Sequence, residues 1–183
     1  MTQFVAAFND IVISRYNKSR EVVDKIKPRF VYAPKERVLH DLVNKGQHLT
    51  LPVVAVTVGS VARDESRVFN KIFGSIENTT TGTHSTHLPS PVPVNIEVNM
   101  SIMTRFQTDM DQIVSNFVPY SNPYVIISWP VPTGLLGSLQ EIRSEVLWGG
   151  SLSLTYPTEL QSNQPTRCTA DTNFTIKGWI FPY

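Results

Sequence analysis

The stretch that most constrains the fold is residues 94–114, where the period of the apolar residues changes without a break. Its first half alternates apolar and polar residues, which is typical of a strand with one buried face. Its second half has apolar residues three and four positions apart, which predicts one face of a helix. No glycine or proline separates the halves, so a strand should lead directly into a helix that packs back on the sheet. The apolar positions are Val94, Ile96, Val98, Met100 and Ile102, then Phe106, Met110, Ile113, Val114 and Phe117.

The ends of this helix also have sequence signals. Thr104 and Gln107 have the spacing of a capping box, which predicts Thr104 as the N-cap. Pro119 is expected to stop the helix, because proline removes a backbone donor and clashes with the preceding turn.

The rest of the chain predicts an α+β fold: an antiparallel or mixed β-sheet with two main helices packed on it and long loop arms. At this length a single domain, residues 1–183, is expected. Pro28 favours an edge strand or a bulge within residues 22–32. The other expected elements are a helical turn at Phe4–Phe8, a strand at Ile11–Ile13, a helix from Pro34 to Gly46 with Val38, Leu39, Leu42 and Val43 on its apolar face, a buried strand at Leu51–Val61, and strands at Tyr124–Trp129, Glu141–Tyr156 with a turn or bulge at Gly149–Gly150, and Phe174–Phe181.

Two segments are expected to be loops, Gly74 to Pro93 and Thr158 to Asp171. Long loops inside a compact domain are uncommon and usually functional or disordered, and the proline end of the first should be stiff and extended. We interpret both loops as arms that contact neighbouring subunits, the alternative being tolerated surface loops. Glu97, on the outer face of its strand, is expected to form a salt bridge or meet a partner. The candidate interface residues are Glu97, Ile76, Asn78, His84, His87, Pro89, Pro91, Pro93, Glu159 and Arg167.

Composition excludes several functional classes. The formal charge of +1 gives no large field that would hold duplex DNA or a membrane surface. Cys168 is the only cysteine, so no intrachain disulfide or cysteine-based metal site can form, and a reducing cytoplasm is expected. The N-terminus lacks the pattern of a signal peptide, and no window approaches the ~20 apolar residues that span a bilayer.

The candidates for chemistry are weak, so we expect no enzyme, cofactor or metal. His84 and His87 could hold a metal only if their loop folded around it, and we interpret them as solvated loop histidines. Asp109 and Asp111 are expected on the polar side of their helix, with Asp109 favoured near its N-terminus. Cys168 has no matched histidine and is interpreted as an unreactive thiol in a polar loop.

The aromatic residues leave a second function open. They could line a platform for a glycan or for single-stranded nucleic acid. They are spread over several strands without interleaved basic residues, which favours core and interface positions. The set is Trp129, Trp148 and Trp179 with Tyr120, Tyr124, Tyr156 and Tyr183.

Several stretches, in order, resemble a known family. The run from Glu97 to Phe106, continued by Asp109-Met110, residues 112–114 and residues 117–120, is similar to the central strand and helix of the tail sheath stabiliser and tail completion proteins of T-even-like contractile-tailed phages. Residues 32–36 resemble that family's strand-to-helix connection. Residues 174–182, with Gly178-Trp179, resemble its closing strand.

The resemblance implies a structural virion protein. It implies a ring, normally a hexamer, that caps the finished tail, lies over the tail-tube terminator, holds the last sheath ring and offers its other face to the neck. DNA would pass through the ring without specific binding, and no membrane would be involved. The expected location is the virion tail and neck, after assembly in the host cytoplasm. A related role as the tail-tube terminator itself remains open.

Overall fold

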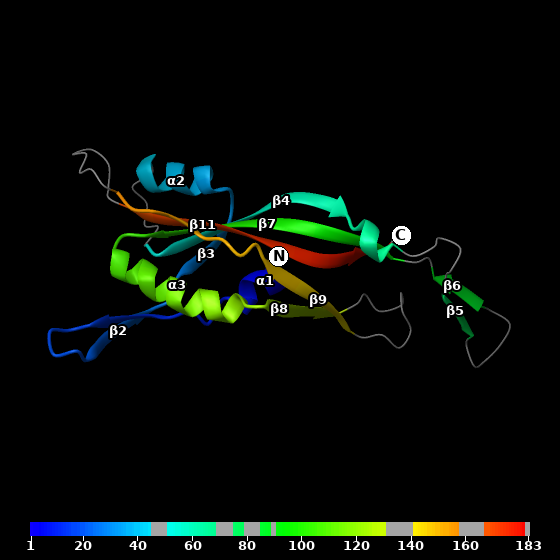
Figure 1. The fold of residues 1–183 in the computed structure, drawn as a ribbon, viewed down its shortest axis with the longest axis horizontal. Coiled ribbons are helices and arrows are strands. Elements are labelled where there is room, and N and C mark those ends of the chain that lie inside the picture. Colours follow the sequence, from blue (N-terminus) through cyan, green and yellow to red (C-terminus); the bar gives the residue numbers. More distant parts are fainter. Residues whose placement is uncertain are drawn as a thin grey trace.

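The computed structural model describes residues 1–44, 51–68, 75–78, 85–88, 91–130, 141–157 and 167–181. The fold is α+β, as predicted, and is mostly strand (Figure 1). In chain order the elements are α1 (Thr2–Ala7), β1 (Ile13–Tyr16), β2 (Val22–Ile26), β3 (Arg29–Tyr32), α2 (Lys35–Asn44), β4 (Val53–Arg63), the 3-10 turn η1 (Glu65–Arg67), β5 (Ser75–Asn78), β6 (Ser85–Leu88), β7 (Val92–Thr104), α3 (Gln107–Ser121), β8 (Tyr124–Pro130), β9 (Glu141–Trp148), β10 (Ser153–Thr155) and β11 (Cys168–Ile180).

A mixed seven-stranded sheet forms the body of the molecule. Six strands lie in the order β3-β4-β7-β11-β9-β8, and β10 pairs with β11 beside this path. Only β3 and β4 are parallel among the described pairs of this sheet. The centre is the antiparallel pair β7–β11, whose ladder runs from Cys168↔Thr104 to Ile180↔Val92. Two further pairs, β1–β2 and β5–β6, form separate two-stranded ribbons.

The alternation predicted for β7 is confirmed in its first half, where Val94 and Val98 are buried and Glu97 is exposed. From Met100 onward every residue of β7 is buried, because helices cover both faces of the sheet there. Ile102 packs in the cluster under α1 and α3, whereas Met103 packs with Val38 of α2.

Aromatic rings fill the larger core, between the sheet and the helices α1 and α3. Phe174 of β11 lies 5.3 Å from Phe4, 5.4 Å from Phe8 and 5.6 Å from Phe117, measured between ring centroids. All of these rings are almost fully buried. The short helix α1 is therefore held by its phenylalanines, since six residues alone would not form a stable helix.

The predicted ends of α3 are both wrong. Thr104 is the last residue of β7, paired with Cys168, and the N-cap is Phe106 without a side-chain capping bond. The ladder with β11 takes precedence over the capping box, and the Thr104 hydroxyl donates to the Phe106 carbonyl instead (3.0 Å). Pro119 lies inside α3, which ends at Ser121. Ser121 is buried and its hydroxyl donates to the Phe117 carbonyl (2.9 Å), so packing outweighs the cost of the proline.

Several other boundaries differ from expectation. The segment expected to be a loop before residue 93 contains the β5–β6 hairpin, and β7 already begins at Val92. β11 begins at Cys168 rather than Phe174, because Cys168, Ala170 and Thr172 alternate inward along β7. The remaining differences are these: β1 begins at Ile13, Pro28 divides residues 22–32 into β2 and β3 of different sheets, and β4 is buried only over Val53–Val56 and exposed from Gly59 onward.

Candidate functional site

The candidate interface residues that the structure describes lie on several different elements. Ile76, Asn78 and His87 lie on the β5–β6 hairpin, while His84, Pro89 and Glu159 lie outside the described residues. Pro93 is buried in β7, and Pro91 and Arg167 are half-buried. Glu97 is exposed on β7 and accepts a hydrogen bond from the Ser60 hydroxyl of β4 (2.9 Å). The two ribbons are the features that project from the sheet.

The β1–β2 ribbon is held at its base by α3. The side-chain amide of Gln112 accepts from the Ser14 backbone N–H (2.9 Å) and donates to the Ser14 carbonyl (3.0 Å). These two bonds satisfy the exposed edge of β1 in the way a neighbouring strand would. The ribbon is thereby tied to a helix 98 residues away in the sequence.

A second contact at the same base is an ion pair. Arg15 lies 3.4 Å from the carboxylate of Asp109, whose side chain is 7% exposed. The Arg15 guanidinium also lies 5.5 Å from the centre of the Phe106 ring, and Arg105 lies 5.6 Å from the same ring. The prediction that Asp109 is on the polar side of α3 is therefore wrong, since the ribbon covers it.

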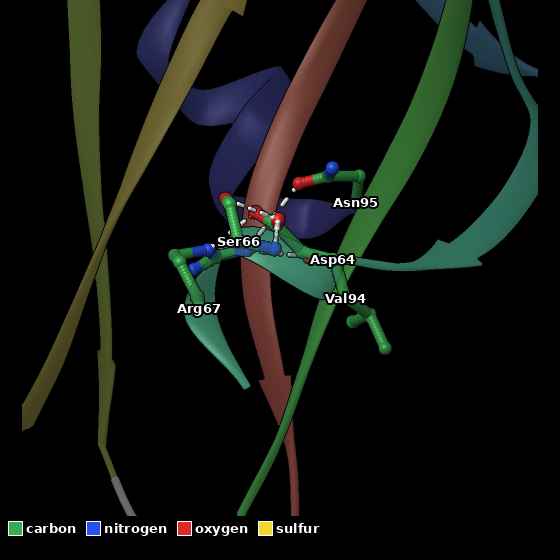
Figure 2. Close-up of polar contacts among 5 residues, drawn as sticks. All are labelled: Asp64, Ser66, Arg67, Val94 and Asn95. Atoms are coloured by element: carbon green, nitrogen blue, oxygen red, sulfur yellow. Dashed lines mark hydrogen bonds and ion pairs between the residues drawn. The ribbon is translucent and has the colours of Figure 1, made fainter. Parts of the chain in front are cut away.

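The second ribbon, β5–β6, follows a polar clamp at the end of β4 (Figure 2). The Asp64 carboxylate accepts from the Ser66 N–H (3.0 Å), the Ser66 hydroxyl (2.6 Å) and the Arg67 Nε–H (2.6 Å). These hydrogen bonds, the Ser66 hydroxyl first and Arg67 next, lower the pKa of Asp64 from 3.8 to about 2, against the effect of burial. The carboxylate is therefore ionised at any physiological pH.

Arg67 connects this clamp to the central strands. Its Nη2 donates to the Val94 carbonyl (3.1 Å) and to the Asn95 side-chain oxygen (3.3 Å) of β7, as Figure 2 shows. Its guanidinium also lies 5.0 Å from the centre of the Trp179 ring on β11. The point at which the chain leaves the sheet towards β5 is thus fixed on β7 and β11.

The aromatic residues are divided between core and surface. Trp148 packs edge-on against Phe117 (6.1 Å between centroids), and its indole N–H donates to the Thr172 hydroxyl (2.7 Å). Trp129 and Tyr156 also pack against the core, whereas Tyr120 and Tyr124 are exposed. Tyr183 lies outside the described residues. The tryptophans thus occupy structural positions rather than one common platform.

Cys168 is not in a polar loop. It is buried in β11, and burial raises the pKa of its thiol. Across the part of the chain that the structure describes, no three His, Cys, Asp or Glu side chains come together as metal ligands. No described helix combines the length and apolar character needed to cross a bilayer.

The anchors of both ribbons were missed from the sequence. The clamp had a local signal, because Asp followed two residues later by Ser is a common N-terminal turn. The contacts of Asp109 and Gln112 had none, since their partners are 94 and 98 residues distant.

Comparison with protein families identifies the family of the chain. The model of the T4-like virus Myoviridae tail sheath stabiliser matches residues 1–183, the whole chain. The chain belongs to this family. No curated protein matches it. Membership of the tail sheath stabiliser family gives the chain a structural role in the contractile tail and confirms the resemblance seen in its central strand and helix.

Proposed function

We propose that the chain assembles into a ring, a hexamer, that caps the phage tail, holds the last sheath ring and joins the tail to the neck. The observation that carries this proposal is the family match over the whole chain, residues 1–183. The partners would be other copies of the chain, the tail-tube terminator, the sheath and the neck proteins. The location would be the virion tail and neck, after assembly in the host cytoplasm.

The fold suits such a ring. A wide sheet with a doubly covered end gives a rigid body, and the β1–β2 ribbon, held by Gln112, gives an arm with a fixed base. A ring of identical subunits needs two different surfaces on each copy, which meet head to tail. A chain with a formal charge of +1 also suits a lumen through which DNA must pass, because tight phosphate contacts would slow the strand.

Tails that lack this protein provide the test. Adding the full chain to such tails should yield tails that bear an extra terminal ring in electron micrographs and that join to filled heads. Tails that retain their sheath and join heads equally well without the protein would overturn the proposal.

The β5–β6 arm has its own test within this proposal. A chain lacking residues 76–90 keeps the Asp64–Arg67 clamp, so it should fold with the same circular dichroism spectrum but fail to complete tails. Its matched control is Ser115→Ala, which removes one exposed hydrogen bond on α3 and leaves the arm intact. Normal tail completion by the deleted chain would remove this arm from the proposal.

A further inference from the structure

The β1–β2 ribbon exposes three large apolar side chains. Val23 is 68% exposed, its neighbour Val22 48%, and Tyr16, which pairs with Val22 across the ribbon, 61%. Two-stranded ribbons are marginally stable in water, and large exposed apolar groups that lie together usually mark a contact surface. Because Gln112 fixes the base, the ribbon presents this surface in one direction.

The same ribbon concentrates positive charge. Residues 13–26, which form the ribbon, contain four basic and two acidic side chains, a net charge of +2. The whole chain carries +1, so the remaining residues together carry −1. Each copy therefore has a positive arm on a negative body, which is the charge distribution that a head-to-tail contact between copies requires.

A matching surface lies on the outer face of β8 and β9. Ile126 is 57% exposed and pairs with Glu145 of β9, which is also exposed. Tyr124 is exposed on the same face, two residues from Ile126. Further along, Arg143 lies between Glu145 and the exposed Glu141, so the face has a net charge of −1. It thus combines apolar and acidic groups where the ribbon combines apolar and basic groups.

The two surfaces lie on either side of α3. In Figure 1 the ribbon projects past the N-terminal end of α3, whereas β8 and β9 lie beyond the C-terminal end of that helix. Within the described residues, β2 pairs only with β1 and β8 only with β9. An arm and an acceptor at separate places allow each copy to bind the next, which closes into a ring when the rotation permits.

We propose that the β1–β2 ribbon of one copy packs on the outer face of β8 and β9 of the next copy. Val22 and Val23 would cover Ile126, and Lys25 would lie near Glu145. This contact rests on the proposed ring and names the surfaces that build it. A second copy is favoured over nucleic acid because the valines and Tyr16 would gain nothing from a phosphate backbone, whereas Ile126 and Tyr124 offer them an apolar counterpart.

The first experiment exchanges the charges. Lys25→Glu and Glu145→Lys should each weaken association of the full chain roughly tenfold, and the double variant should recover most of that loss. The measurement is sedimentation of the purified chain at increasing concentration, or occupancy on tails if the chain assembles only there. Arg63→Glu is the matched control, since it makes the same change of charge at an exposed strand position away from both surfaces. Equal loss in the control, or no recovery in the double variant, would overturn the contact.

The second experiment locates the contact. Mixing Val23→Cys with Ile126→Cys should give a disulfide-linked dimer under mild oxidation, and a chain with both changes should give a ladder. Cys168 is buried, so single variants should give no comparable product. Rings or decorated tails that form normally without any cross-link, and without sensitivity to the charge exchange, would overturn this contact while leaving the proposed function intact. Tails that never needed the protein would overturn the proposed function itself.

Discussion

Two pairs of a carboxylate and an arginine, one at the base of the β1–β2 ribbon and one at the end of β4 before β5, form in different ways. Asp64 and Arg67 are three residues apart, and the Arg67 Nε lies 2.6 Å from the Asp64 carboxylate, which also accepts a hydrogen bond from the Ser66 hydroxyl. Asp109 and Arg15 are 94 residues apart in the sequence, and the Arg15 guanidinium lies 3.4 Å from the Asp109 carboxylate. The first pair can form wherever the local turn forms. The second exists only after α3 has packed on the sheet, so the β1–β2 ribbon depends on the global fold and the clamp before β5 depends much less on it.

The largest effect should come from the core on which α3 packs. Phe174→Ala removes a ring that touches Phe4, Phe8 and Phe117 and should lower the free energy of unfolding by about 3–5 kcal/mol. Because α3 carries the anchor of β1, hydrogen exchange of the β1–β2 ribbon should rise with it. Phe106→Ala is the matched control: this ring is 48% exposed and should cost far less in urea unfolding. Similar losses in both variants would mean that the aromatic cluster is not the support of α3.

A smaller effect is expected from the anchor itself. Gln112→Ala removes both hydrogen bonds to Ser14 and should cost about 1–2 kcal/mol, at roughly 1 kcal/mol for each bond. Amide exchange should accelerate in β1 and β2 and stay unchanged in β7 and β11. Asn116→Ala on the same helix, whose amide donates to the Gln112 carbonyl, should leave the ribbon protected. Slow exchange in the Gln112 variant would contradict the long-range anchor.

The contrast between the anchors also explains how far sequence reasoning reached. The strand within residues 94–104 and the helices at α2 and α3 followed from apolar periodicity, which is a local signal. Thr104 and Pro119 misled because their local signals were outweighed by the ladder to Cys168 and by the burial of Ser121. The helical pattern predicts Asp109 on the polar side of its helix, and it cannot show that a ribbon from residues 13–26 covers that side chain.

Acid tests the clamp at Asp64. The pKa of Asp64 is lowered to about 2 in the folded chain, whereas an aspartate in the unfolded chain has a pKa of about 3.9. The contribution of Asp64 to stability is therefore fully present above about pH 3.9 and is lost as the pH falls towards 2. Thermal unfolding between pH 5 and pH 2 should show this loss in the natural chain and not in Asp64→Asn. Ser66→Ala removes the hydrogen bond that lowers the pKa of Asp64 most and should move the loss to higher pH. An identical pH profile for all three chains would exclude the clamp as the source.

The reactivity of Cys168 separates effects on the β1–β2 ribbon from effects on the core. Burial raises the pKa of its thiol, so a thiol reagent should modify the native chain on the order of a hundredfold more slowly than the unfolded chain. Cys168 pairs with Thr104 at the end of the β7–β11 ladder, which belongs to the seven-stranded sheet and not to either ribbon. The Gln112→Ala chain should therefore keep the slow rate although its ribbon is loosened, and the Phe174→Ala chain should react faster. Fast modification in the Gln112 variant would show that the ribbon and the central strands open together. The β1–β2 ribbon would then not be able to loosen independently of the central sheet.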